Sequence, residues 1–118
     1  MDDVEGKNPE QEKILVVDVD GTITYQRRPD YGSSDVINGS VEWVNQKKKE
    51  GWYIVFWTGR SWDDYRVTKE LLDYAGFEYD ELICGKPVTM RMVIIDDKPI
   101  DFVHVKRNGG LKNVQIPE

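Results

Sequence analysis

Apolar residues in this chain gather in short unbroken runs that alternate with segments of helical periodicity. The longer runs cover residues 14–17, 52–57 and 92–95, and two shorter runs cover 82–84 and 102–105. Strands that are buried on both faces show no polar alternation, so these runs predict strands of a parallel sheet. Residues 21–36 show no clear period and are expected to form a long loop, a length that is often functional.

Two helices are expected between the strands. Asn38 can cap a helix that runs to about Glu50, with Gly51 as its stop. Ser61 begins a capping box that opens the second helix, which ends before Gly76. The order strand–helix–strand–helix–strand predicts an α/β domain whose parallel strands are joined by right-handed crossovers.

One connection does not fit a simple crossover. Only seven residues separate Cys84 from Met92, whereas a parallel crossover normally takes about a dozen residues or more. Two arrangements stay open: residues 82–84 form a short edge segment, or the chain passes in extended form from one side of the sheet to the other.

Two pairs of carboxylates stand at the ends of predicted strands. Asp18 and Asp20 follow the run 14–17, and Asp96 and Asp97 follow the run 92–95. Ligands of open α/β sheets bind outside the carboxyl ends of the strands, so both pairs can converge on one point. Carboxylates that close repel one another, and a divalent cation is the usual relief.

Composition narrows the class of protein. The chain has 118 residues, 39% of them hydrophobic, which is enough for one domain with a real core. Residues 1–12 are polar and acidic and are expected to form a flexible tail before a single domain at 13–118. A net charge of −6 argues against broad, non-specific binding of nucleic acid.

Location is predicted from the same composition. Cys84 is the single cysteine, which excludes a disulfide framework and favours a reducing compartment. No signal peptide and no apolar run of membrane-spanning length is evident, so a cytoplasmic protein without a membrane partner is expected.

Four short motifs stand in a characteristic order along the chain. They are Asp18-Val19-Asp20-Gly21-Thr22, Thr58-Gly59-Arg60, Gly85-Lys86-Pro87 and Asp96-Asp97-Lys98. From about Ile14 to Ile100 this order resembles the haloacid dehalogenase (HAD) superfamily, in which nearly all members handle phosphoryl groups. The finer spacing is similar to small HAD proteins of capsule or polysaccharide biosynthesis.

The resemblance implies a three-layer Rossmann-like α/β domain with a small, mostly parallel sheet. There is room only for a loop and one helix between Gly21 and Tyr53, and for one helix between Arg60 and Glu81. The chain is therefore expected to lack a cap domain. It also lacks the helix that usually lies between the lysine and the final acidic pair.

By the same resemblance, Asp18 is the nucleophile of a Mg²⁺-dependent phosphatase and Asp20 its general acid and base. Asp18, Asp20, Asp96 and Asp97 are the candidate metal ligands. Thr58 and Lys86 would hold the phosphoryl oxygens.

Substrate contacts are expected from residues beside these motifs. They are Gly21, Thr22, Gly59, Arg60, Arg27 and Arg28. Arg27 and Arg28 lie in the loop after the nucleophile and could hold a second anionic group, although simple surface solvation is an equal alternative for them.

Several functions remain open at this point. The first is hydrolysis of a small phosphorylated substrate, such as a sugar phosphate or nucleotide, by a monomer or a homo-oligomer. A nucleic-acid end phosphatase and a catalytically silent binding module are the alternatives. A signalling receiver domain also clusters acids, a threonine and a lysine around Mg²⁺, but its acidic pair comes first and its lone acceptor aspartate later, so the order here disfavours it.

Overall fold

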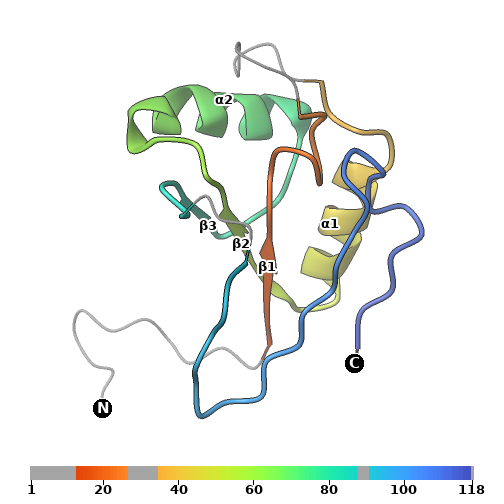
Figure 1. Cartoon of the computed structure of the whole chain (residues 1–118). Helices are drawn as coiled ribbons and strands as arrows, with labels where there is room; N and C mark the ends of the chain where they lie inside the picture. The colour runs from red at the N-terminus through yellow and green to blue at the C-terminus, as the bar shows by residue number, and fades with distance from the viewer. Residues whose placement is uncertain (1–12, 27–34, 88–90, 118) are drawn as a thin grey trace, which may run out of the picture.

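The computed structural model describes residues 13–26, 35–87 and 91–117. Three parallel strands, β1 (Ile14–Val17), β2 (Tyr53–Trp57) and β3 (Glu81–Ile83), are hydrogen-bonded in the order β1-β2-β3. Helix α1 (Ser40–Lys49) connects β1 to β2, and the short 3₁₀ helix η2 (Trp62–Asp64) leads into α2 (Tyr65–Ala75), which connects β2 to β3 (Figure 1). The predicted α/β Rossmann-like fold with a small parallel sheet is confirmed, and neither described connection holds a cap domain.

The core lies where the two helices cover the sheet. Ile54 and Phe56 on β2 are fully buried, and Val44 of α1 and Leu72 of α2 pack into the same cluster. The Phe56 ring meets Phe77 edge to face, with ring centroids 5.5 Å apart. The central strand is therefore buried as its unbroken apolar run predicted.

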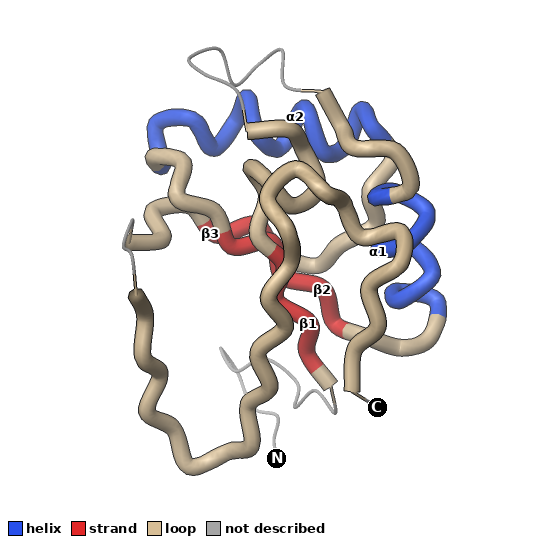
Figure 2. The backbone as a smooth tube through the Cα atoms, turned by 45° about the vertical axis from the view of Figure 1, so that its right-hand side comes forward, coloured by secondary structure: helices blue, strands red, loops and turns tan. Residues whose placement is uncertain are grey.

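Strand β1 is less buried than its sequence indicated. Ile14 and Val16 are about half exposed, because β1 is an edge strand among the described residues. The run at 92–95, predicted to be a further buried strand, is not one, and the short run at 102–105 is not a strand either. Residues 91–105 instead form a long open loop whose Ile95 side chain is 94% exposed (Figures 1 and 2).

The short link explains why this part of the prediction was wrong. A run of apolar residues indicates only that a segment can be buried. The segment can join the sheet only if the connection before it is long enough to return the chain there. Seven residues between Cys84 and Met92 are too few for the helix of a normal crossover, and the described residues 92–95 have no strand assignment.

The helix starts differ slightly from their predicted positions. The N-cap of α1 is Gly39 with φ of 87°, not Asn38, because Ile37 is already bonded to the Ile23 carbonyl and the chain must turn at once. Ser61 caps the second helical segment as predicted, accepting a bond from the Asp63 amide at 3.0 Å, but the first turn is 3₁₀.

The C-terminal part of the chain packs back over α1 and the loop after β1. Leu111 is buried in the core, and the Trp43 indole donates to the Val114 carbonyl at 3.1 Å. The Asn108 amide donates to the Gly21 carbonyl at 2.7 Å. Residues from the end of the chain therefore hold the loop that follows the first strand.

Two further predictions concern the N-terminal tail and membrane-spanning segments. The acidic tail expected at 1–12 lies outside the described residues. In the described ranges, neither helix has the length and apolar character that crossing a bilayer requires.

Leu72→Ala should lower the free energy of unfolding by about 2–5 kcal/mol, because it leaves a cavity in a fully buried position. Tyr74→Ala, two residues further along the same helix and 96% exposed, is the control and should change stability by less than about 0.5 kcal/mol. Urea denaturation measures both, and equal effects would contradict the packing described for α2.

Candidate active site

A tight turn after β1 carries the first acidic pair. The buried Val19 carbonyl accepts hydrogen bonds from the amides of Thr22, Ile23 and Thr24 at 3.1, 2.9 and 3.1 Å. Gly21 has a φ of 88°, which favours glycine at this point of the turn. Asp18 and Asp20 flank Val19, so the turn fixes both carboxylates at the carboxyl edge of the sheet.

Lys86 reaches the first of these acids. Its Nζ lies 2.9 Å from Asp18 Oδ1, while Thr22 Oγ1 donates to Asp18 Oδ2 at 3.3 Å. The Lys86 ammonium also stands over the Trp57 ring, 5.6 Å from its centroid. Both charged side chains are partly exposed, so a ligand can approach them from solvent.

Thr58 holds the strand-end loops together. Its amide donates to the Ile83 carbonyl, and its carbonyl accepts from the Lys86 amide, both at 2.9 Å. Its side-chain oxygen accepts from the Arg60 amide at 3.1 Å. A hydroxyl that accepts one bond can still donate its proton to a phosphate oxygen, so the local geometry suits the predicted role.

Gly85 adds a further link between these loops, because its amide donates to the Arg60 carbonyl at 2.8 Å. The backbone of the Gly85-Lys86 segment thus pairs with the Thr58-Gly59-Arg60 segment. This pairing holds Lys86 beside the loop after β2. The short link between Cys84 and Met92 had left its position undecided.

Arg60 is buried and forms a two-pronged ion pair with Asp20. Nε donates to Asp20 Oδ2 and one terminal amino nitrogen donates to Asp20 Oδ1, both at 2.8 Å. The other terminal nitrogen donates to Thr68 Oγ1 on α2 at 3.0 Å, and Thr24 Oγ1 donates to Asp20 Oδ1 at 3.1 Å. Arg60 is only 2% exposed, so in this structure its guanidinium holds Asp20 and does not face solvent.

The second acidic pair lies apart from the first. Asp96 accepts from the Lys98 amide at 2.8 Å, and Asp97 pairs with the Lys98 ammonium at 3.2 Å. Both acids are exposed on the open loop that residues 91–105 form. Within the described ranges, no group of three or more His, Cys, Asp or Glu side chains is placed to share a metal ion.

Three further candidate residues and the single cysteine complete the comparison with the sequence-based prediction. Gly59 is exposed beside Thr58, whereas Arg27 and Arg28 lie outside the described residues. Cys84 is buried at the end of β3, and this burial raises the pKa of its thiol. A buried thiol of raised pKa is a poor nucleophile, which agrees with its expected role as a small hydrophobic residue.

Sequence reasoning missed the contribution of the C-terminal segment. Asn108 has a φ of 63°, its amide donates to the Gly21 carbonyl, and its side-chain oxygen accepts from the Gln26 amide at 2.8 Å. Arg107 packs its stem against Gly21. The dipeptide Asn108-Gly109 is a turn signal, but nothing in it indicates which loop the turn contacts.

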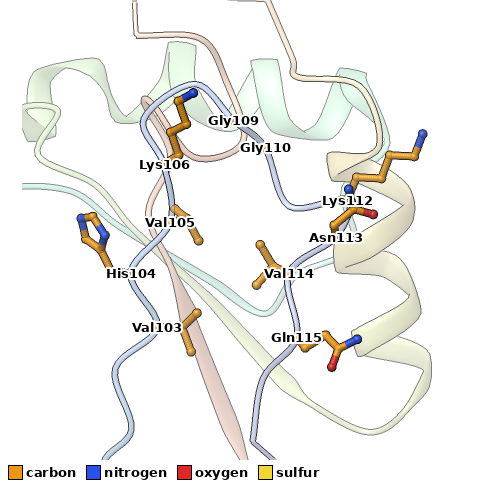
Figure 3. Close-up of a pocket in the computed structure, with 10 residues that line it drawn as sticks. All are labelled: Val103, His104, Val105, Lys106, Gly109, Gly110, Lys112, Asn113, Val114 and Gln115. Atoms are coloured by element: carbon orange, nitrogen blue, oxygen red, sulfur yellow. The ribbon is translucent and has the colours of Figure 1, made fainter.

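A shallow groove of about 430 Å³ lies between residues 103–106 and 109–115 (Figure 3). Its lining includes Val103, Val105 and Val114, with Lys106 at one end. None of the predicted site residues lines it.

Comparisons with known proteins support the fold. No protein-family profile and no curated protein sequence matches this chain. A structural-genomics target from Vibrio cholerae has a similar structure, with a TM-score of 0.59 and 29% identity over 75% of this chain and 82% of that chain.

Two chains of the Pnkp1/Rnl/Hen1 RNA repair complex are also similar, with TM-scores of 0.58 and 0.55. Their identities are 18% and 17%, over 72% and 76% of this chain. This chain spans only 32% of the length of each. At such identities the likeness concerns the fold alone.

Arg60→Ala should lower the free energy of unfolding by about 3 kcal/mol, because it leaves Asp20 without its buried partner. Arg66→Ala, which removes an exposed arginine of α2, should change stability by no more than about 0.5 kcal/mol. In a double-mutant cycle, Arg60→Ala with Asp20→Ala should cost less than the sum of the two single changes. Additive losses in urea denaturation would contradict the pair.

Proposed function

We propose that this chain is a HAD-type phosphatase that hydrolyses a phosphomonoester through an aspartyl-phosphate intermediate. The observation that carries the proposal is the contact between Lys86 and Asp18, at the strand edge where Thr58 also lies. A carboxylate, an ammonium and a hydroxyl together can attack a phosphoryl group and neutralise its oxygens.

In the proposed reaction, Asp18 attacks phosphorus and forms an aspartyl phosphate as the bond from phosphorus to the ester oxygen breaks. Asp20 gives that oxygen a proton, so an alcohol leaves. Asp20 then takes a proton from water, whose oxygen attacks phosphorus, and inorganic phosphate and free Asp18 result. Lys86 exchanges its contact with Asp18 for one with a phosphoryl oxygen during the first step.

Arg60 has a positioning role in this proposal. Its fork fixes the plane of the Asp20 carboxyl group, and Thr24 adds a third bond from the same turn. Both Asp20 oxygens accept from Arg60 in this structure. The proposed proton transfer therefore requires one of them to leave the guanidinium, carry a proton and face the substrate oxygen when substrate binds.

We propose Mg²⁺ as the cofactor, which would offset the negative charge shared by Asp18 and the phosphate. The donors fit this ion: Mg²⁺ usually takes one or two carboxylates, and water and phosphate oxygens complete its shell. Asp18 and the Asp20 main-chain carbonyl are the ligands proposed at the turn. Asp96 and Asp97 are proposed as further ligands only if segment 91–98 adopts another position when metal is bound.

A nucleic-acid end phosphatase is the second candidate. The similarity to chains of an RNA repair complex favours it, because a broken RNA strand can end in a phosphate. The acidic net charge of −6 weighs against a protein that grips long nucleic acid, so the first candidate remains a phosphorylated metabolite. A silent binding module would use Lys86 to hold an anion and would need Asp20 only as the partner of the buried Arg60.

Asp18→Asn should abolish turnover of phosphomonoesters in the presence of Mg²⁺. Asp20→Asn should slow turnover about 10²- to 10⁴-fold, and a phosphorylated protein should accumulate, detectable as a mass increase of one phosphoryl group. Asp63→Asn, at an exposed acid of η2, is the control and should keep wild-type activity. Wild-type activity in Asp18→Asn would overturn the proposal.

Asp96→Asn should raise the Mg²⁺ concentration needed for half-maximal activity by roughly tenfold or more if Asp96 joins the metal site. Asp101→Asn removes another exposed acid of the same loop and should leave that concentration unchanged. Calorimetric titration with Mg²⁺ gives a second measure that does not depend on turnover. An unchanged affinity in Asp96→Asn would mean that Asp96 is not a ligand.

A further inference from the structure

Trp62 is an exposed aromatic side chain that is held by contacts with two neighbouring residues. It is the first residue of η2 and is 57% exposed. Its ring stacks on that of Tyr65, with centroids 5.6 Å apart and planes inclined by 21°. Tyr65 is itself partly buried against the core, so one face of the indole rests on a fixed ring.

The edge of the same indole lies against Gly85. A Cβ atom at Gly85 would stand 3.0 Å from Trp62 Nε1 and 3.1 Å from Cδ1, closer than side chains normally allow. Gly85 also has a φ of 80°, which favours glycine. Glycine at this position thus lets the edge of the indole approach the backbone just before Lys86.

This places the indole at the rim of the candidate active site. Gly85 is bonded to the Arg60 carbonyl, and its neighbour Lys86 contacts Asp18. In Figure 1 the segment that follows β3 lies at the same corner of the molecule as the start of α2. Trp62 thus lies against the backbone directly before Lys86, the residue that is proposed to meet the substrate phosphate.

We infer that Trp62 is a stacking platform for a nucleobase, and that the substrate is a phosphomonoester that carries a base. Single exposed aromatic residues are ordinary on protein surfaces, and Tyr74, on the outer side of α2, is one of them. Trp62 differs because its ring is held by Tyr65 and by Gly85, the chain neighbour of the lysine that is proposed to hold phosphate. A flat, fixed indole suits a base, since every base offers a π face.

The inference is compatible with the net charge of −6. Base stacking needs no positive surface, so an acidic protein can use it to select a substrate. The part of the inference that concerns the phosphate rests on the proposed function, and the part that concerns the base rests on Trp62 alone. The two halves can be tested separately.

The experiment compares an adenosine monophosphate with the matching ribose phosphate that lacks the base. The variants are Trp62→Leu, which keeps an apolar group on Tyr65, Trp62→Phe, which keeps an aromatic face, and the control Tyr74→Ala. Trp62→Leu should lower kcat/KM for the nucleotide by roughly tenfold and change that for ribose phosphate by less than about twofold. Trp62→Phe should retain most of the nucleotide activity.

Binding is measured in parallel by calorimetry with Asp18→Asn protein, which cannot turn the nucleotide over. Adding Trp62→Leu should weaken nucleotide binding by roughly tenfold. If the nucleotide binds in a Trp62-dependent manner but wild-type protein hydrolyses nothing, the platform stands and the proposed function fails. If hydrolysis is robust but Trp62→Leu affects both substrates equally, or neither, the platform is wrong and the proposed function stands.

Discussion

The buried pair between Arg60 and Asp20 is the constraint on which the site depends. It joins three parts of the chain that are distant in sequence: the turn after β1, the loop after β2 and, through Thr68, helix α2. A guanidinium withdrawn from water needs nearly all of its donors satisfied, and Asp20 and Thr68 supply acceptors for this one. Arg60 therefore links the position of Asp20 to that of α2.

A second constraint is the backbone pairing between the loops after β2 and β3. Thr58 and Arg60 exchange main-chain bonds with residues on both sides of Cys84, which extends the parallel pairing of β2 and β3 past the end of the strands. The ammonium of Lys86 owes its position to these bonds more than to its own side-chain contacts. Lys86 can thus lie at the strand edge although it comes only three positions after Ile83, the last residue of β3.

The sequence predicted the parts of the structure that depend on local patterns. The apolar runs at β1 and β2, the cap at Ser61 and the helix stop at Gly76 are local signals, and each appears near its expected place. The prediction of a buried strand at 92–95 was wrong because an apolar run is buried only where other parts of the chain pack against it. The local sequence does not show whether such a packing partner exists.

The positions of some candidate site residues were predictable to a similar extent. Motif order indicated that Asp18, Thr58 and Lys86 share the strand edge, and the structure brings them there. The partner of Arg60 was not predictable, because a buried guanidinium is recognised only once its acceptors are placed in space. The contact of Asn108 with the turn after β1 was equally hidden, since it joins positions far apart along the chain.

That last contact has a consequence for how the molecule is made. Asn108 accepts from the Gln26 amide across 82 positions, and closing so long a loop comes late because its entropy must be lost before the contact forms. A growing chain on the ribosome would complete its sheet and helices while the turn that bears Asp18 still lacked its final brace. That turn would then be held at Gly21 and Gln26 only once residue 108 joins a sheet and helices that are already in place.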